Sequence, residues 1–221
     1  MRSSAVNAPA PGVVPSAEDL QPLLEALKSI AAAFKADDVP FALAGSYAVY
    51  ARGGARSLHD VDFVVPVDAL PAAISALERR GFRVAQPPED WLVKAFVGDL
   101  VIDVIHELAM GPVDAEILAR ADELRVESVL MPVLAATDLL VAKLRALWEH
   151  SCDLEPVLAV ARTLREQVDM ATVEAACVDH PYAEAGLFLI RRLGIVQDGT
   201  RPAEETAGGQ GERPTRQGAG T

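Results

Sequence analysis

Three aspartates lie in stretches that otherwise read as apolar β-strands. Asp60 and Asp62 alternate with apolar residues at the start of a run that ends at Val65, and Asp103 lies in the middle of the apolar run 101–105. Residues two apart in a strand point to the same side, so Asp60 and Asp62 would repel each other unless a cation lies between them. Mg²⁺ prefers carboxylate oxygens together with substrate phosphates. If the two strands are neighbours, the three aspartates form an acidic triad for metal-dependent phosphoryl chemistry, with Mn²⁺ as a possible substitute for Mg²⁺.

A Gly-Ser pair ends the apolar run 39–44 and opens the next helical segment. The free N–H groups and the dipole at the start of a helix suit a phosphate. Gly45 lets the backbone come close to such a group, and Ser46 adds a hydroxyl. Taken alone, the pair is better explained by an ordinary strand-to-helix turn.

The elements that must position these residues follow from periodicity. Some segments have helical spacing of apolar residues, and others are apolar runs bounded by turn residues. Thr137 is predicted to cap one of the helices. Together these patterns predict an α+β fold class: a small mixed β-sheet with helices on it, followed by a helical C-terminal part. The pattern predicts helices at 16–35, 47–52, 69–80, 137–148, 157–167, 172–177 and 182–193, strands at 39–44, 61–65, 91–97 and 100–105, and further extended stretches at 81–84 and 125–134.

Composition divides the chain into four predicted parts. Residues 1–15 and 197–221 are rich in small and polar residues without periodicity and are predicted to be disordered tails. Residues 16–135 form the predicted core and 136–196 the helical part. There is no signal-peptide pattern and no apolar run long enough to span a membrane, so we expect a cytoplasmic protein without a membrane partner.

The net charge is −12. That charge argues against a protein coated in basic surface for nucleic acid, although a local basic groove remains possible. Cys152 and Cys177 are too few for a disulfide framework. Trp91 and Trp148 are expected in the core.

The spacing of the polar motif resembles a known superfamily. Gly45-Ser46, thirteen further residues and then Asp60-Val61-Asp62 resemble the signature of the polymerase-β-type nucleotidyltransferases. The resemblance covers about residues 39–161 and implies a nucleotidyltransferase core that moves a nucleoside monophosphate from an NTP to an acceptor hydroxyl. It implies the following site: Asp60, Asp62 and Asp103 as metal ligands and catalytic residues, and Gly45, Ser46 and Arg56 against the nucleotide.

The C-terminal half resembles one branch more closely. Residues 131–143, followed by Asp153-Leu154, are similar to the AbiEii/MenT group of toxin nucleotidyltransferases. This resemblance implies that Lys143 binds the nucleotide phosphates and that Asp153 positions Lys143 or acts on the acceptor. The acceptor would be RNA, with the tRNA 3′ end favoured, or a protein hydroxyl, and the partner an antitoxin protein.

Other interpretations remain open at this point. Transfer to a small molecule, as in lincosamide or aminoglycoside resistance enzymes, fits the acidic net charge, and a non-catalytic nucleotide-binding module is the option without an enzyme. Several residues also have ordinary structural alternatives: Lys143 as a surface lysine, Asp153 as a helix N-cap, His59 and His106 as packing residues, and Arg52 either as structural or as facing a triphosphate.

Overall fold

The computed structural model describes residues 17–55 and 61–196. The predicted tails at 1–15 and 197–221 therefore lie outside the described residues, as do Asp60 and Arg56. No helix of the described ranges is long and apolar enough to cross a membrane.

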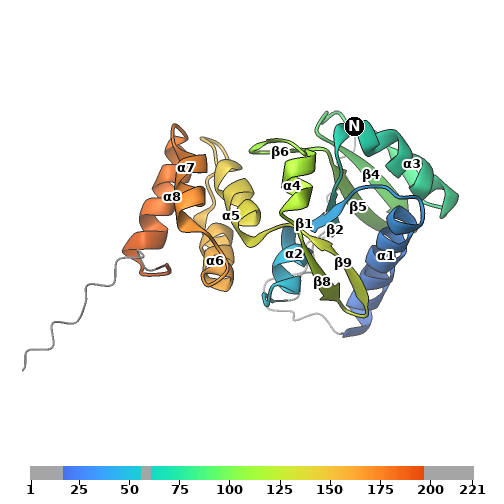
Figure 1. Ribbon diagram of the computed structural model, residues 1–221, viewed down its shortest axis with the longest axis horizontal. Helices are drawn as coiled ribbons and strands as arrows, with labels where there is room; N and C mark the ends of the chain where they lie inside the picture. The colour runs from blue at the N-terminus through green and yellow to red at the C-terminus, as the bar shows by residue number, and fades with distance from the viewer. Residues whose placement is uncertain (1–16, 56–60, 197–221) are drawn as a thin grey trace, which may run out of the picture.

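Seven strands of the described chain form one mixed sheet, in the order β3-β4-β5-β2-β1-β9-β8 (Figure 1). β2 pairs with β5, and β1 with β9, in parallel, whereas the other neighbours are antiparallel. This arrangement confirms the predicted α+β class. The strands are β1 (Ala42–Ala44), β2 (Val61–Val64), β3 (Arg83–Ala85), β4 (Leu92–Val97), β5 (Leu100–Ile105), β8 (Asp122–Val126) and β9 (Val129–Val133). A separate ribbon pairs β6 (Glu107–Leu108) with β7 (Gly111–Pro112).

Helices cover both faces of the sheet. In Figure 1, α1 and α3 lie on one side, α2 and α4 on the other, and α5 to α8 form a group beyond α2 and α4. The helices are α1 (Ala17–Ala36), α2 (Gly45–Ala51), α3 (Leu70–Arg79, after a 3-10 turn at Val67–Ala69), α4 (Ala115–Ala119), α5 (Ala136–Arg145), α6 (Leu154–Leu164), α7 (Met170–Cys177) and α8 (Pro181–Arg192).

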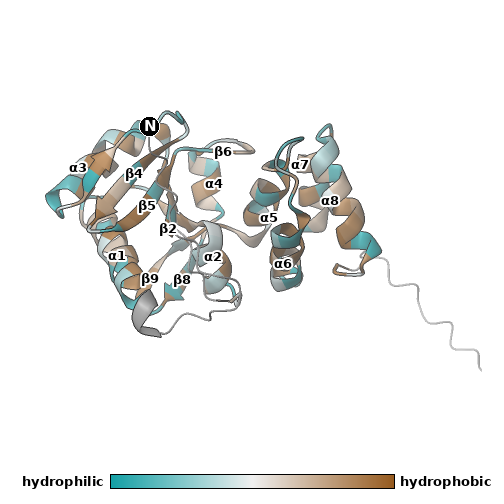
Figure 2. Cartoon of the chain, turned by 180° about the vertical axis from the view of Figure 1, so that it is seen from behind, coloured by the Kyte–Doolittle hydropathy of each residue, from teal (hydrophilic) through white to brown (hydrophobic). Residues whose placement is uncertain are grey.

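The main core lies between the sheet and α1. Alternation along each strand sends one set of side chains toward this layer, and Figure 2 shows the apolar colouring of the central strands. Phe34 of α1 contacts Phe63 of β2 edge to face, with ring centroids 5.8 Å apart. On β2, β4 and β5 the buried apolar residues of this sheet face are Val61, Phe63, Val93, Ala95, Ile102 and Val104. The alternating positions of the same strands therefore face α2 and α4.

A second apolar cluster joins α5 to α8. α8 approaches α5 closely, because a Cβ on Gly186 would lie 2.7 Å from Cδ2 of Leu144. α5 also serves the first core, to which it contributes Ala136 and Leu139. Residues 136–196 thus begin with a helix that is shared by both clusters. The division of the chain at this point stays a prediction.

The stretch 125–134, predicted as one extended segment, is the main part of the β8–β9 hairpin. The chain turns at Glu127, which has φ 54°. Positive φ is uncommon outside glycine, and Asn and Asp are the usual exceptions. A glutamate gives no turn signal, so the sequence did not indicate this turn.

The β6–β7 ribbon and α4 were not predicted from the sequence. The two strands of the ribbon are two residues long, and α4 has five residues. Elements this short show no measurable periodicity. The start of α4 is stabilised locally, because the Asp114 carboxylate accepts a hydrogen bond from the N–H of Ile117 at 2.8 Å.

Thr137 does not cap α5, contrary to the prediction. Its hydroxyl oxygen instead accepts a hydrogen bond from the N–H of Asp169 at 3.0 Å, which ties the start of α7 to α5. α5 also ends at Arg145, before Trp148, where the sequence predicted its end. The backbone of Trp148 pairs with that of Ser151 at 3.1 and 3.0 Å, in a tight turn that a continuing helix could not form.

Candidate functional site

Three charged residues lie side by side across the centre of the sheet. Asp62 of β2 is directly opposite Asp103 of β5, and Asp103 is directly opposite Lys94 of β4. Neighbouring strands are about 4.8 Å apart, so directly opposite side chains lie on the same face within reach of one another. These positions alternate with the buried apolar ones, and they therefore lie on the face toward α2 and α4. We call Lys94, Asp103 and Asp62 the charged row.

Within the charged row, Lys94 and Asp103 form an ion pair. Nζ of Lys94 donates to Oδ1 and Oδ2 of Asp103 at 2.8 and 3.0 Å. The Asp103 side chain is 13% exposed and that of Lys94 is 32% exposed, so solvent screens this pair only in part. The lysine offsets the cost of a half-buried carboxylate in a sheet.

Lys94 was not among the predicted site residues, although the sequence carries a signal for its position. The predicted hairpin turn at Gly98-Asp99 pairs Val97 with Leu100, as the structure shows. Counting back along the two strands from that pair places Lys94 opposite Asp103. Lys94 is also the single charged residue of β4, which is otherwise apolar.

The structure brings Gly45 directly against Asp62. Gly45 has φ +57°, and a Cβ at this position would lie 1.8 Å from Oδ2 and 2.7 Å from Cγ of Asp62. Any other residue would need either the Asp62 carboxylate or the start of α2 to move. β1 and β2 enforce this proximity, because Ala44, the last residue of β1, is the register partner of Asp62. The Gly-Ser element and the second aspartate therefore belong to one place in the fold.

Ser46 carries a buried hydroxyl that has no hydrogen-bond partner among the described residues. Ala44, the N-cap residue of α2, makes no side-chain hydrogen bond to the first turn of that helix. A buried hydroxyl without a partner costs roughly 1–3 kcal/mol, and such groups in native structures call for a partner outside the described chain. Ser46 thus marks a polar position beside Gly45 and Asp62.

Lys143 and Asp153 lie in the helical part. Lys143 is exposed near the end of α5, and it makes no hydrogen bond or ion pair with any residue that the structure describes. Asp153 is the exposed N-cap of α6, where its carboxylate accepts from the N–H of Glu155 at 3.1 Å. The structure thus places neither residue in contact with the charged row. Their roles toward the nucleotide stay predictions.

Arg52 is a structural residue rather than one that faces a triphosphate. Its side chain is only 5% exposed. Nε donates to the carbonyl of Leu134 at 2.8 Å, and Nη2 donates to Asp122 at 2.6 Å. These bonds tie the end of α2 to β8 and to the chain after β9. The partners are 70 and 82 residues away along the chain, which is why the sequence did not reveal them.

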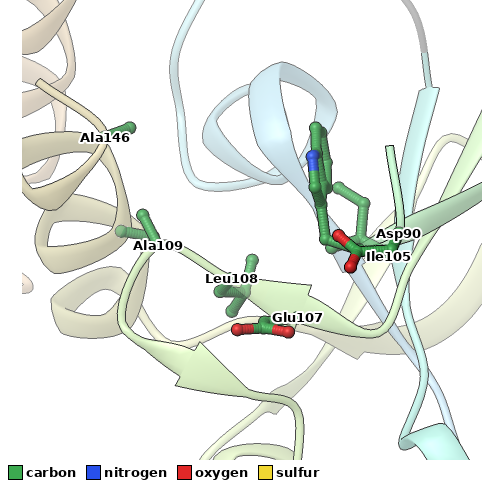
Figure 3. A pocket seen from close by; sticks show the side chains of 8 residues that line it. Asp90, Ile105, Glu107, Leu108, Ala109 and Ala146 are labelled. Atoms are coloured by element: carbon green, nitrogen blue, oxygen red, sulfur yellow. The ribbon is translucent and has the colours of Figure 1, made fainter. Parts of the chain in front are cut away.

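A cavity of about 440 Å³ lies between the sheet and α5 (Figure 3). Trp91 lies at its wall and is 41% exposed, so the expectation of a core tryptophan was wrong, as it was for Trp148 at 54%. Trp91 is exposed because it precedes β4, at the end of the sheet. The lining residues are Asp90, Trp91, Ile105, Glu107, Leu108, Ala109, Ala142 and Ala146.

The charged row supplies two carboxylates that suit a divalent ion. Oxygen donors on adjacent strands are what Mg²⁺ and Mn²⁺ prefer. The described residues alone contain no group of three or more His, Cys, Asp or Glu side chains arranged to hold a metal. The third predicted ligand, Asp60, lies outside them. The carboxylates of Asp62 and Asp103 are donors of the type that such an ion binds.

Comparison with known proteins finds similarity to nucleotidyltransferases. A family model described as "uncharacterised nucleotidyltransferase" matches residues 16–192. No curated protein matches the sequence significantly. The antibiotic-resistance factor ANT(2″)-Ia, solved in solution, has a TM-score of 0.58 at 16% identity, covering 78% of this chain and 98% of that one.

Two further solved structures are more distant. A putative nucleotidyltransferase from Thermotoga maritima has a TM-score of 0.46 at 15% identity and covers 57% of this chain and 84% of that one. A lincosamide antibiotic adenylyltransferase with lincomycin bound has a TM-score of 0.45 at 12% identity and covers 69% and 98%. At these identities the solved structures bear on the fold alone.

Proposed function

This chain belongs to the family of uncharacterised nucleotidyltransferases, and we propose that it transfers a nucleoside monophosphate from an NTP to an acceptor hydroxyl at the charged row. One observation carries the placement of the site. The register sets Asp62 opposite Asp103. The Asp62 carboxylate occupies the space that a side chain at position 45 would need, so it can lie there only because residue 45 is glycine. The sequence elements expected to hold metal and phosphate therefore meet at one position on the sheet.

A divalent ion is part of this proposal. Asp62 and Asp103, with Asp60 from the neighbouring sequence, are the residues that would hold Mg²⁺ or Mn²⁺. When bound, such an ion neutralises phosphate oxygens and stabilises the charge that develops during transfer. The support is the pairing of two carboxylates, Asp62 and Asp103, at directly opposite positions on adjacent parallel strands.

The remaining residues bind and orient. The Ser46 hydroxyl, which lacks a partner in the described chain, would donate to a phosphate oxygen of the NTP. Lys143 and Arg56 would add positive charge along the triphosphate, and Asp153 would position Lys143. These three assignments rest on the sequence resemblance.

Asp103 would orient the acceptor hydroxyl, because Lys94 holds both of its carboxylate oxygens in a fixed position. A carboxylate has lone pairs left to accept a further hydrogen bond. The acceptor oxygen forms a bond to the α-phosphorus, and the bond from that phosphorus to the β-phosphate bridging oxygen breaks. Pyrophosphate leaves, and the hydroxyl proton passes to Asp103 or to water.

The acceptor separates two versions of this function. One is RNA at the tRNA 3′ end, with the protein acting as a toxin beside an antitoxin, as the resemblance of residues 131–154 to the AbiEii/MenT group implies. The other is a small molecule such as an antibiotic. A non-catalytic nucleotide-binding module is a third possibility, against which the intact charged row and the family membership both speak.

Labelling tests the proposal directly. The full chain is incubated with each α-³²P-labelled NTP and Mg²⁺, in separate reactions with total RNA and with a panel of hydroxyl-bearing small molecules. We expect label on one acceptor class, loss of at least a thousandfold with Asp62→Asn, and no loss with Asp99→Asn, which changes an exposed turn residue. Labelling by Asp62→Asn at the wild-type rate would refute the site.

A growth assay tests the toxin version. Expression of a toxin arrests growth, and a co-expressed antitoxin relieves the arrest. Normal growth, together with label on small molecules alone, would exclude this version and leave the nucleotidyltransferase proposal standing.

A further inference from the structure

We propose that the cavity between the sheet and α5 is the acceptor site, and that it takes a small hydroxyl-bearing molecule with a protonated amine. This inference rests on the proposed function, since it assigns the acceptor of the same reaction.

The cavity lies next to the charged row on the same face of the sheet. Ile105 lines it and stands two residues after Asp103 in β5. Two residues of a strand span about 7 Å and point to the same side. The register of β4 agrees, because Leu92 is opposite Ile105 and Lys94 is opposite Asp103. A molecule in the cavity would therefore reach the carboxylates at which transfer is proposed.

The walls suit a compact ring-bearing molecule. Ala142 and Ala146 lie one turn apart on α5, and their small side chains leave the space open. The opposite wall carries Trp91, whose backbone carbonyl accepts from the N–H groups of His106 and Glu107 at 3.0 and 3.3 Å. Because these bonds fix its backbone while its side chain stays 41% exposed, the indole can stack on a sugar ring or a cation. A volume of about 440 Å³ falls within the range of small-molecule sites.

The charged residues at the cavity wall are acidic. Two of the lining residues, Asp90 and Glu107, are carboxylates, and none of the lining residues that the structure describes is basic (Figure 3). Neither carboxylate makes a side-chain hydrogen bond or an ion pair with any residue of the described ranges. Arg145 donates to the backbone carbonyl of Ala109, a lining residue, at 3.4 Å and to that of Ala176 at 2.8 Å. An ammonium group is the complement of such a pair of carboxylates.

The same charge disfavours an RNA acceptor. A phosphate of an RNA end in this cavity would face Asp90 and Glu107, with no cation among the described lining residues to offset them. RNA-binding surfaces are positively charged. The net charge of −12 points the same way. RNA is therefore an outcome of the test rather than a second proposal.

Binding is measured without NTP, so that a failure of catalysis leaves this test intact. The full chain carrying Trp148→Phe reports through Trp91 fluorescence. The probes are tobramycin and spermidine as amines, maltotriose as a neutral polyol, and total tRNA. We expect the amines to quench this fluorescence, and we expect Glu107→Gln or Asp90→Asn to weaken their binding at least tenfold. Trp91→Leu removes the reporter, so its binding is measured by calorimetric titration, where we expect an equal loss. Glu89→Gln, which changes an exposed neighbour outside the lining, should bind as the parent does.

The outcomes divide clearly. Amine binding that depends on Glu107 and Asp90 supports the proposal, and label on an amine-bearing alcohol in the presence of NTP strengthens it. Equal binding of maltotriose, tighter binding of tRNA, or no binding of either amine would each overturn it. If both amines bind through Glu107 and Asp90 but nothing is ever labelled, the cavity is an amine-binding site, and both the proposed function and the acceptor assignment fail.

Discussion

Gly45 lies at φ +57° with its Cα against the Asp62 carboxylate. We predict that Gly45→Ala lowers nucleotide transfer at least a hundredfold, because a Cβ 1.8 Å from Oδ2 must displace either Asp62 or the start of α2. The left-handed backbone adds roughly 1–2 kcal/mol of strain. Steady-state transfer kinetics and urea unfolding measure the two effects.

Gly98→Ala is the matched control for that variant. Gly98 has φ +58° in the turn between β4 and β5, and a Cβ there would meet nothing within 4 Å. It carries the same backbone strain without the clash. Equal losses of activity in both variants would show that strain, and not the position of Asp62, accounts for the effect.

Lys94 holds the Asp103 carboxylate in a half-buried position beside Asp62. We predict that Lys94→Met lowers the free energy of unfolding by about 1–3 kcal/mol in metal-free buffer, because the carboxylate loses its charged partner. Added Mg²⁺ should restore part of this loss, since the ion then meets two carboxylates with no competing ammonium. Chemical unfolding with and without Mg²⁺ measures the loss of stability and its recovery.

Lys94→Arg keeps the charge and should behave like the wild type in metal-free buffer. If Mg²⁺ stabilises the wild type and Lys94→Met equally, Lys94 does not compete with the ion and the charged row is not its site.

At the scale of elements, Arg52 joins α2 to the β8–β9 end of the sheet. We predict that Arg52→Met lowers the free energy of unfolding by about 2 kcal/mol, because the carbonyl of Leu134 and the carboxylate of Asp122 lose a charged donor. The KM for NTP should stay unchanged in the folded protein. Denaturant unfolding and initial-rate kinetics check the two statements.

Arg83→Met serves for comparison. Arg83 is exposed and lies over the Phe96 ring at 4.2 Å, so its loss should change stability by less than about 1 kcal/mol. A large rise in KM with Arg52→Met and unchanged stability would instead assign Arg52 to the nucleotide.

At the scale of the whole molecule, α5 links the two apolar clusters. Its N-terminal residues pack in the first cluster and its later residues in the second. An ion pair reinforces this junction, because Arg120 at the end of α4 donates to both oxygens of buried Asp138 at 3.0 and 3.1 Å. This hydrogen bonding raises the pKa of the Arg120 guanidinium above its usual range, so the guanidinium stays protonated in the ion pair.

We therefore predict one cooperative unfolding transition. Cys177 is a probe within the second cluster, because burial raises the pKa of its thiol and so lowers the reactive thiolate fraction in the folded protein. In a Cys152→Ser background, the denaturant midpoint for Cys177 alkylation should coincide with that of far-ultraviolet circular dichroism. Alkylation at a clearly lower midpoint would mean that the helical part opens by itself.

Much of the local structure followed from the sequence by itself. Helices α1, α3, α6 and α8 have amphipathic spacing, and the strands that carry Asp62 and Asp103 are apolar runs closed by turn residues. The apolar neighbours of both aspartates also predicted strand positions for them. These features are encoded over ten or twenty residues, where periodicity and turn chemistry act.

Only the tertiary structure decided which strands are neighbours. The pairing of β2 with β5 places Asp62 opposite Asp103, and the pairing of β1 with β2 places Gly45 against Asp62. Such contacts depend on packing between segments that are far apart in the chain, which no local pattern encodes. The partners of Arg52 and the exposure of Trp91 were missed for the same reason. The sequence alone thus determined which residues could carry out chemistry, and the order of the strands decided which of them lie together.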